Sequence, residues 1–159
     1  MVGMQTRPGI NTNWSQRFKR LYYVNVRDHF GAKGDGVTDD TAAIQAAIDS
    51  GADHIDLGTG TYLISSTLTL GGACRFTGSG MDTCALTGNF ATGNVLDLGN
   101  TGFHDVGQFT ITTTVNRTAD AAIHVDVSDC YIHDIRINYP FGGILQDGGA
   151  VNIIERIYI

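Results

Sequence analysis

With 159 residues, of which 42% are hydrophobic, the chain is long enough to bury the core of one domain, and a disordered chain is excluded. Twenty-one glycines against two prolines, together with many Thr, Ile, Val, Asp and Asn residues, indicate a mostly β protein with frequent turns. The net charge of −6 argues against nucleic acid as the main ligand, because binding to phosphates requires Lys and Arg.

Residues 1–22 are predicted to form an extended basic arm. Residues 1–27 carry five basic side chains and no acidic one, whereas the rest of the chain carries five basic and sixteen acidic groups. A basic arm on an acidic body indicates that the arm contacts a separate partner, although a solvated, flexible start fits the pattern equally well. The candidate attachment residues are Trp14, Arg17, Lys19 and Arg20.

Export signals and metal motifs are missing from the sequence. Met1–Arg20 lacks the apolar core of a secretory signal, and no run approaches membrane-spanning length, so we expect synthesis in the cytoplasm and no membrane insertion. Cys74, Cys84 and Cys130 lack the spacing of metal ligands and are interpreted as small buried hydrophobic residues. We therefore expect no metal and no cofactor.

A helix is predicted after Phe30–Thr41, which reads as a loop with three glycines. Thr38 or Asp39 can cap the start of this helix, where acidic side chains are favourable, and Gly51 ends it. Its expected apolar stripe consists of Ala43, Ile44, Ala47 and Ile48.

Beyond this helix the hydrophobic pattern becomes strand-like, and no further helix is expected. Short apolar runs alternate with turn residues through to the end of the chain. The clearest of these runs, with one that precedes the helix, are Val24–Val26, Ile55–Leu57, Thr61–Ile64, Thr67–Leu70, Ala122–Val127 and Gly143–Asp147.

A weak internal repeat runs through the second half of the chain. Ile132–Ile137 matches Ile154–Ile159 at a spacing of 22 residues, and Phe103–Val106 is a looser copy 29 residues before Ile132. Coils of this length cannot bury their apolar faces alone, so they must stack. The pattern predicts a parallel β-helix, whereas a β-sandwich would favour hairpins with Asn-Gly or Asp-Gly turns.

The repeat also predicts which residues stack on successive coils. The expected inward pairs are Ile132 over Ile154 and Ile135 over Ile157. One outward column is expected to contain His104, His133 and Glu155, and a neighbouring column near a bend is expected to contain Asp105, Asp134 and Arg156.

Residues 30–48, FGAKGDGVTDDTAAIQAAI, resemble the opening motif of the pectate-lyase-like β-helix superfamily, which is common in phage tailspikes and capsule depolymerases. The segments HIDLGTGTYLISSTLTL and CRFTGSGMDTCALTG are similar to the next strands and the glycine-rich first coil of that family. The departures are His29 before Phe30, and Gly58-Thr59 where the family usually has prolines. Covering residues 24–159, the resemblance implies a right-handed parallel β-helix whose N-terminal end is plugged by an amphipathic helix.

The resemblance further implies the N-terminal part of a phage tailspike or tail fibre. Residues 1–22 would attach to other tail or baseplate proteins, and residues 23–159 would start a homotrimeric β-helix that meets a host surface glycan. Because Ile159 ends inside an apolar strand pattern, we expect the polypeptide to continue, with the acids of a lyase or glycoside hydrolase on later coils. The alternatives are an exported bacterial polysaccharide lyase or glycosidase and a purely structural β-helix module. A phosphate-binding glycine loop is disfavoured, because no GxxxxGK[ST] or GxGxxG is present.

Catalytic residues are not assigned from the sequence, because no position matches a catalytic motif. Glycan-cleaving enzymes use carboxylates along a groove, and aromatic rings stack on sugars. The outward polar candidates for glycan binding are His104, His124, Asp126, His133, Arg136 and Glu155, and the aromatic candidates are Tyr131, Tyr139, Phe141 and Tyr158. His133 beside Glu155 is the most suggestive pair, and an ordinary solvated β-helix face is the competing interpretation.

Overall fold

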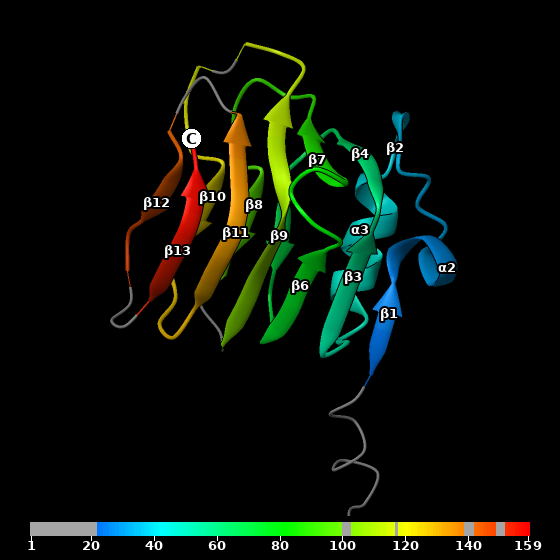
Figure 1. The fold of residues 1–159 in the computed structure, drawn as a ribbon, viewed down its shortest axis with the longest axis horizontal. Coiled ribbons are helices and arrows are strands. Elements are labelled where there is room, and N and C mark those ends of the chain that lie inside the picture. Colours follow the sequence, from blue (N-terminus) through cyan, green and yellow to red (C-terminus); the bar gives the residue numbers. More distant parts are fainter. Residues whose placement is uncertain (1–21, 100–102, 117, 139–141, 149–151) are drawn as a thin grey trace, which may run out of the picture.

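The computed structural model describes residues 22–99, 103–116, 118–138, 142–148 and 152–159. The chain is a right-handed parallel β-helix of about five turns, as the sequence predicts. Two sheets form its walls, and β12, β10 and β8 lie behind β13, β11 and β9 in Figure 1. Every strand pair in both sheets is parallel, because each coil returns the chain to the same wall before it makes the next strand.

The larger wall is a nine-stranded sheet in the order β1-β3-β6-β9-β7-β4-β2, with β11 paired to β9 and β13 to β11. Its strands are β1 Tyr23–Asn25, β2 Asp35–Asp39, β3 His54–Gly58, β4 Gly60–Ile64, β6 Cys74–Gly78, β7 Cys84–Gly88, β9 His104–Thr113, β11 Tyr131–Asn138 and β13 Ile153–Tyr158. The first half of β9 pairs with β6 and its second half with β7. In the first coils the larger wall therefore consists of two separate branches. They join at β9, and the later coils form one continuous sheet.

The smaller wall is a four-stranded sheet in the order β12-β10-β8-β5. Its strands are β5 Leu68–Leu70, β8 Leu96–Leu98, β10 Ile123–Val125 and β12 Ile144–Gln146. Each strand is three residues long, so one or two inward side chains per coil meet the larger wall.

The predicted 22-residue register is confirmed. Ile132 pairs with Ile154, and Ile135 pairs with Ile157. Ile132 is fully buried, whereas Ile154 is 40% exposed, because within the described residues no strand pairs with the far side of β13. The third copy is placed wrongly by the sequence, because Ile132 pairs with Val106 rather than Phe103.

The strands of the later coils bend at one residue in the left-handed backbone region. Gln108, Asp134 and Arg156 have φ values of 65°, 51° and 52° at equivalent points of β9, β11 and β13. The predicted stacking of Asp134 and Arg156 at a bend is therefore confirmed. Asp105 does not belong to that column, because it pairs with Tyr131 ahead of the bend.

The core lies between the two walls and is almost entirely aliphatic and aromatic. Its largest fully buried side chains include Tyr62, Phe76, Phe109, Leu86 and Leu96. The three cysteines are free and buried, as predicted. Burial raises the pKa of Cys74 and of Cys84 to about 12, which keeps both as unreactive thiols.

The predicted helix is α3, Thr41–Asp49, and it buries Ile44, Ala47 and Ile48. The N-cap residue is Asp40, one position after the predicted Asp39, and its side chain makes no capping bond. Asp39 still contacts the helix start, because it accepts a hydrogen bond from the Thr41 amide at 3.0 Å. Thr38 does not, because its hydroxyl donates to Asp35 at 2.8 Å.

Asp40 is 2% exposed and supports the preceding loop rather than the helix. Its two carboxylate oxygens accept the amides of Lys33 at 2.6 Å and Gly34 at 2.9 Å. The Asp40 carboxylate therefore fixes the loop before the helix, a role that the sequence analysis did not predict.

Helix α3 covers the N-terminal edge of the four-stranded sheet, as the resemblance implies. The Gln45 side chain donates to the Thr69 carbonyl at 3.1 Å and accepts from the Thr69 amide at 3.0 Å. Thr69 is the middle residue of the edge strand β5. The amide of Gln45 therefore occupies hydrogen-bonding groups that would otherwise invite another strand.

Two short elements contradict the sequence prediction. Val26 begins the short helix α2, Val26–Phe30, instead of ending a strand. The helix begins there because the Asn25 side chain caps it, accepting hydrogen bonds from the Arg27 amide at 3.0 Å and from the Asp28 amide. The predicted glycine loop contains β2, whose Asp35 and Asp39 pair with β4.

In the described part of the chain, no helix is long and apolar enough to cross a membrane.

Candidate functional site on the outer face of the nine-stranded sheet

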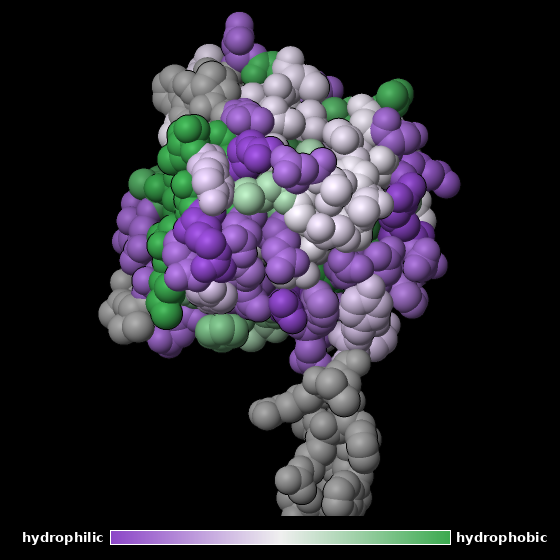
Figure 2. Space-filling model, in the orientation of Figure 1, coloured by the Kyte–Doolittle hydropathy of each residue, from purple (hydrophilic) through white to green (hydrophobic). Residues whose placement is uncertain are grey.

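Outward polar side chains form a ladder over the first halves of the strands in the nine-stranded sheet. Figure 2 shows hydrophilic residues gathered over the middle of this face. We call this set the polar ladder, and its members are Arg75, Asp105, Tyr131, His133, Asp134, Glu155 and Arg156. They come from β6, β9, β11 and β13, so the ladder connects four successive coils.

His133 is the centre of the polar ladder. Its Nε2 lies 3.0 Å from Asp105 and its Nδ1 lies 2.8 Å from Asp134, so each ring nitrogen meets a carboxylate. Arg75 binds the other oxygen of Asp105 at 3.1 Å, and the Tyr131 ring stacks on the imidazole at a centroid distance of 4.4 Å.

The carboxylates of Asp134 and Glu155, at the C-terminal end of the polar ladder, are held in the ionised form. Arg156 binds Asp134 through two nitrogens at 2.6 and 3.0 Å. This bond, with that of His133, lowers the pKa of Asp134 to about 2. A hydrogen bond from the Tyr131 hydroxyl, with Arg156 nearby, lowers the pKa of Glu155. Neither carboxyl is therefore suited to act as a general acid near neutral pH.

The predicted pair of His133 and Glu155 is brought together, because the two residues are register partners on β11 and β13. The placement of His104 in the same outward column is wrong. Its side chain is fully buried, it pairs with Cys74, and burial lowers its pKa. Gly107 is the residue of β9 that pairs with His133.

Two further polar candidates lie on the opposite wall. His124, on β10, lies between Asp97 and Asp147 with its nitrogens 3.3 Å from each carboxylate. Asp126 follows the same strand and is exposed. The single polar strip predicted on adjacent coils is therefore wrong, because the strand register assigns these residues to different sheets.

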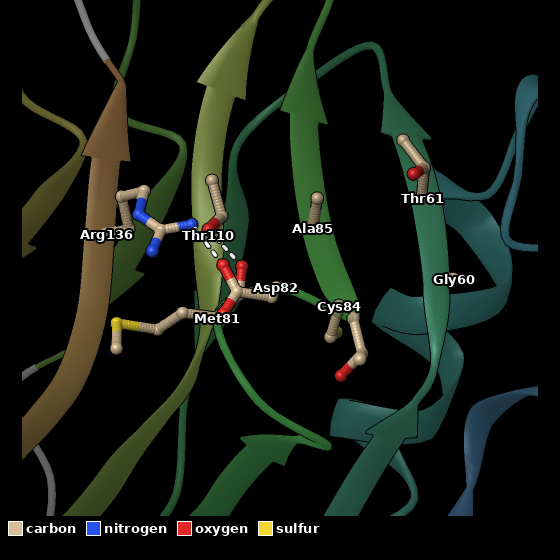
Figure 3. Close-up of a pocket in the computed structure, with 9 residues that line it drawn as sticks. Gly60, Thr61, Met81, Asp82, Cys84, Ala85, Thr110 and Arg136 are labelled. Atoms are coloured by element: carbon tan, nitrogen blue, oxygen red, sulfur yellow. Dashed lines mark hydrogen bonds and ion pairs between the residues drawn. The ribbon is translucent and has the colours of Figure 1, made fainter.

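A shallow groove of about 240 Å³ lies over β4, β7 and the second halves of β9 and β11. Thr61, Ala85, Thr110 and Arg136 are successive register partners on β4, β7, β9 and β11, and all four line it. Figure 3 shows their side chains along the groove, with Met81 and Asp82 of the β6–β7 loop beside them. A row of register partners runs across the strands, so the groove follows the axis of the β-helix.

The groove has a floor of small side chains and ends at Arg136. Thr61 and Ala85 leave room above the sheet, and Thr110 donates a hydrogen bond to the Met81 carbonyl at 2.6 Å. Arg136 closes the row, and Tyr158, its register partner on β13, is 52% exposed beyond it. Hydroxyls, a guanidinium and an exposed aromatic ring suit a hydroxyl-rich ligand that lies along the axis.

Sequence reasoning selected Arg136 and Tyr158 but missed the rest of the groove. The sequence does contain a signal for the groove, because small outward residues recur at near-coil spacing, at positions 61, 85 and 110. Trp14, Arg17, Lys19, Arg20, Tyr139 and Phe141 lie outside the described residues. Within those described, no three His, Cys, Asp or Glu side chains gather as a metal site.

Comparison with known proteins identifies the family. Residues 23–154 match the family model described as rhamnogalacturonase A/epimerase, pectate lyase-like. The chain belongs to this family. The match covers most of the β-helix, including the strands that carry the polar ladder and the groove.

Relatives of this pectate lyase-like chain include phage and bacterial proteins. It is 72% identical over 29 residues to depolymerase 1, capsule K30/K69-specific, of Klebsiella phage K5-2, a match that covers 18% of the chain and 4% of the depolymerase. It is 58% identical over 45 residues to alginate lyase 7 of Azotobacter vinelandii, covering 26% of the chain and 5% of the lyase. The matches therefore span only a small part of these curated relatives.

Solved structures share the fold over a longer stretch. The ORF18 protein of Geobacillus virus E2 is 28% identical, with a TM-score of 0.65 over 77% of this chain and 27% of its own. The iota-carrageenase of family GH82 from A. fortis is 19% identical, with a TM-score of 0.54 over 83% of this chain and 39% of its own. The second likeness, at that identity, supports the fold alone.

Proposed function

We propose that this chain is part of a phage tail protein whose β-helix binds a host surface polysaccharide. The observation that carries the proposal is the likeness to the ORF18 protein of Geobacillus virus E2, which extends over 77% of the chain. The similarity to a capsule depolymerase of a Klebsiella phage supports the same reading. The groove offers a place for the ligand, because its row of small side chains ends in Arg136 and Tyr158.

Filling the groove tests the binding proposal. Ala85 is an outward residue on its floor, so Ala85→Trp adds bulk without entering the core. The matched control is Leu145→Trp, at a 44% exposed position on the opposite wall. Against a panel of capsular polysaccharides, the Ala85 variant should lose affinity on the order of tenfold, and the control should not. Equal affinities for both variants and the unchanged chain would contradict binding in the groove.

Cleavage is tested separately, on the full-length protein. Incubation of that protein with each bound polysaccharide, followed by assays of reducing ends and of unsaturated uronate absorbance, distinguishes three outcomes. Unsaturated ends indicate a lyase, new reducing ends alone indicate a hydrolase, and binding without either indicates an adhesin. The solution mass of the same sample tests the proposed homotrimer, for which a monomer would be the contrary result.

We further propose that residues 1–22 attach the protein to other phage tail or baseplate proteins, through Trp14, Arg17, Lys19 and Arg20. The support is the basic character of this segment beside an acidic body. Replacing Arg17, Lys19 and Arg20 by Ala should abolish incorporation into particles and leave polysaccharide binding unchanged. The control is Arg27→Ala in α2, and incorporation of the triple variant at the normal level would refute the attachment role.

The similarity to alginate lyase 7 favours one second candidate, a free bacterial polysaccharide lyase. That reading predicts activity on soluble alginate without any other viral component. Alginate therefore belongs in the panel, and cleavage of alginate but of no capsular polysaccharide would favour this alternative.

A further inference from the structure

The loop between β6 and β7 reaches across the groove to Arg136. Between the paired positions Thr77–Gly107 and Ala85–Thr110, the chain inserts residues 78–84 where β9 has only Gln108 and Phe109. The extra residues fold back over the outer face. In Figure 3 Asp82 extends from this loop toward Arg136, two coils further along the axis.

The backbone of this loop is fixed to the sheet. The Gly80 amide donates to the Gln108 carbonyl at 2.8 Å, the Cys84 amide donates to the Gly80 carbonyl at 2.9 Å, and Thr110 binds the Met81 carbonyl. These bonds hold Asp82 at the groove in the absence of any ligand, so its position is built into the fold.

The Asp82 side chain, by contrast, is held by one ion pair. Its Oδ1 lies 2.6 Å from Nη1 of Arg136, and the two side chains are 80% and 37% exposed. Ion pairs this accessible to water contribute little to stability, so either partner exchanges readily for another charge. Arg136 has further guanidinium donors in a planar fork that matches a carboxylate or a sulfate.

We propose that Asp82 is a specificity-determining residue whose carboxylate competes with an acidic group of the glycan for Arg136. The inference rests on the proposed function, and it adds that the groove takes glycans bearing carboxylate or sulfate groups. A ligand anion that binds Arg136 displaces the Asp82 carboxylate. The Asp82 side chain, which is already exposed, then turns outward into solvent. Asp82 thereby lowers the affinity of Arg136 for every anionic ligand. Anions that have no sugar ring to contact the groove floor are excluded.

The test compares two variants of the groove with a charge-matched control. Asp82→Asn keeps the size of the side chain and removes its charge, and Arg136→Gln removes the cation. Asp28→Asn changes the net charge equally in α2, away from the groove. The probes are oligogalacturonate, a sulfated galactan and neutral dextran, measured by calorimetry in low salt, together with acetate, an anion without a sugar ring, followed by amide shifts at Ala85 and Thr110.

Asp82→Asn should bind the two acidic probes about five- to tenfold more tightly than the unchanged chain, Arg136→Gln should lose them, and Asp28→Asn should match the unchanged chain. Acetate should shift the Ala85 and Thr110 amides in the Asp82 variant alone. Unchanged affinity for acidic probes in Asp82→Asn, or an equal gain in Asp28→Asn, would overturn the inference. Capsular polysaccharide binding that still depends on Ala85 would then leave the proposed function standing, whereas loss of that dependence would overturn both.

Discussion

Gly107 lies directly against the backbone carbonyl of His133, its register partner one coil later. A Cβ added to Gly107 would come closer than 3.0 Å to that oxygen and would also meet the imidazole ring. A backbone atom cannot move away by changing rotamer. The approach of these two coils, and with it the position of His133 in the polar ladder, therefore depends on the missing side chain.

Gly107→Ala should lower the free energy of unfolding by about 3 kcal/mol, because the new methyl group forces two paired strands apart. Gly71→Ala is the control, since a Cβ there meets nothing within 4 Å, and it should change stability by about 0.5 kcal/mol or less. Urea unfolding followed by circular dichroism measures both. Similar losses in the two variants would contradict the close approach.

Asp40→Ala should destabilise the chain by about 3 kcal/mol, because the amides of Lys33 and Gly34 lose the charged acceptor that the buried Asp40 side chain supplies. Asp39→Ala, one residue earlier, removes an exposed acceptor at the helix start and should cost about 1 kcal/mol. Thermal unfolding of the two variants gives the ranking. A larger loss for Asp39→Ala would show that the contact at the helix start matters more than the loop.

Gln45→Ala should destabilise the chain by about 1 kcal/mol, although alanine is the better helix former. The loss arises because both hydrogen-bonding groups of Thr69 are released at the edge of β5. Hydrogen exchange at the Thr69 amide should become faster while amides in the centre of β9 stay protected. A stabilised variant would mean that helix propensity outweighs the edge contact.

Stability should fall as the pH drops from about 7 toward 5. Burial lowers the pKa of His104 and of His54 below the ordinary value of 6.5, so the unfolded chain gains protons first. The buried imidazole of His104 contributes a slope of at most about 1.4 kcal/mol per pH unit between 6.5 and its lowered pKa, and the partly buried His54 contributes less. Below about pH 4 the lowered pKa of Asp134 adds a second loss, because the unfolded carboxyl is protonated while the folded one stays ionised.

His104→Leu isolates the first of these two losses. The Nε2 of His104 is buried without a hydrogen-bond partner in the described part of the chain, so an apolar replacement of similar size removes an unsatisfied group. Urea unfolding between pH 5 and 7 should show a flatter profile for this variant. A profile parallel to that of the unchanged chain would mean that His104 is not the source of the slope.

Much of the fold follows from local sequence. The helix at Thr41–Asp49, its apolar stripe and the strands around Ile55–Leu57 and Thr61–Ile64 are set by periodicity and turn residues. The stacking of Ile132 on Ile154 follows from the 22-residue spacing of two similar segments in the sequence. Local pattern is sufficient there because each residue's environment is fixed by neighbours in sequence.

The candidate site follows much less from sequence, because coil lengths vary. Asp105, Tyr131 and Ile153 are paired at intervals of 26 and 22 residues, whereas the sequence alignment places Phe103 29 residues before Ile132 and so shifts β9 by three residues. That misalignment is why His104 was expected outside and Gly107 was overlooked. A shift of one residue exchanges the inner and outer faces of a strand. A small error in the predicted register therefore exchanges buried and exposed positions.

The sequence by itself determined that this chain forms stacked parallel coils closed at one end by a helix, because hydrophobic period and turn chemistry act over a few residues. Only the tertiary structure decided that Thr61, Ala85, Thr110 and Arg136 share one groove and that Asp82 reaches across it. Those contacts join residues from different coils, and they depend on the insertion at residues 78–84 and on the buried side chains that set the register of each strand.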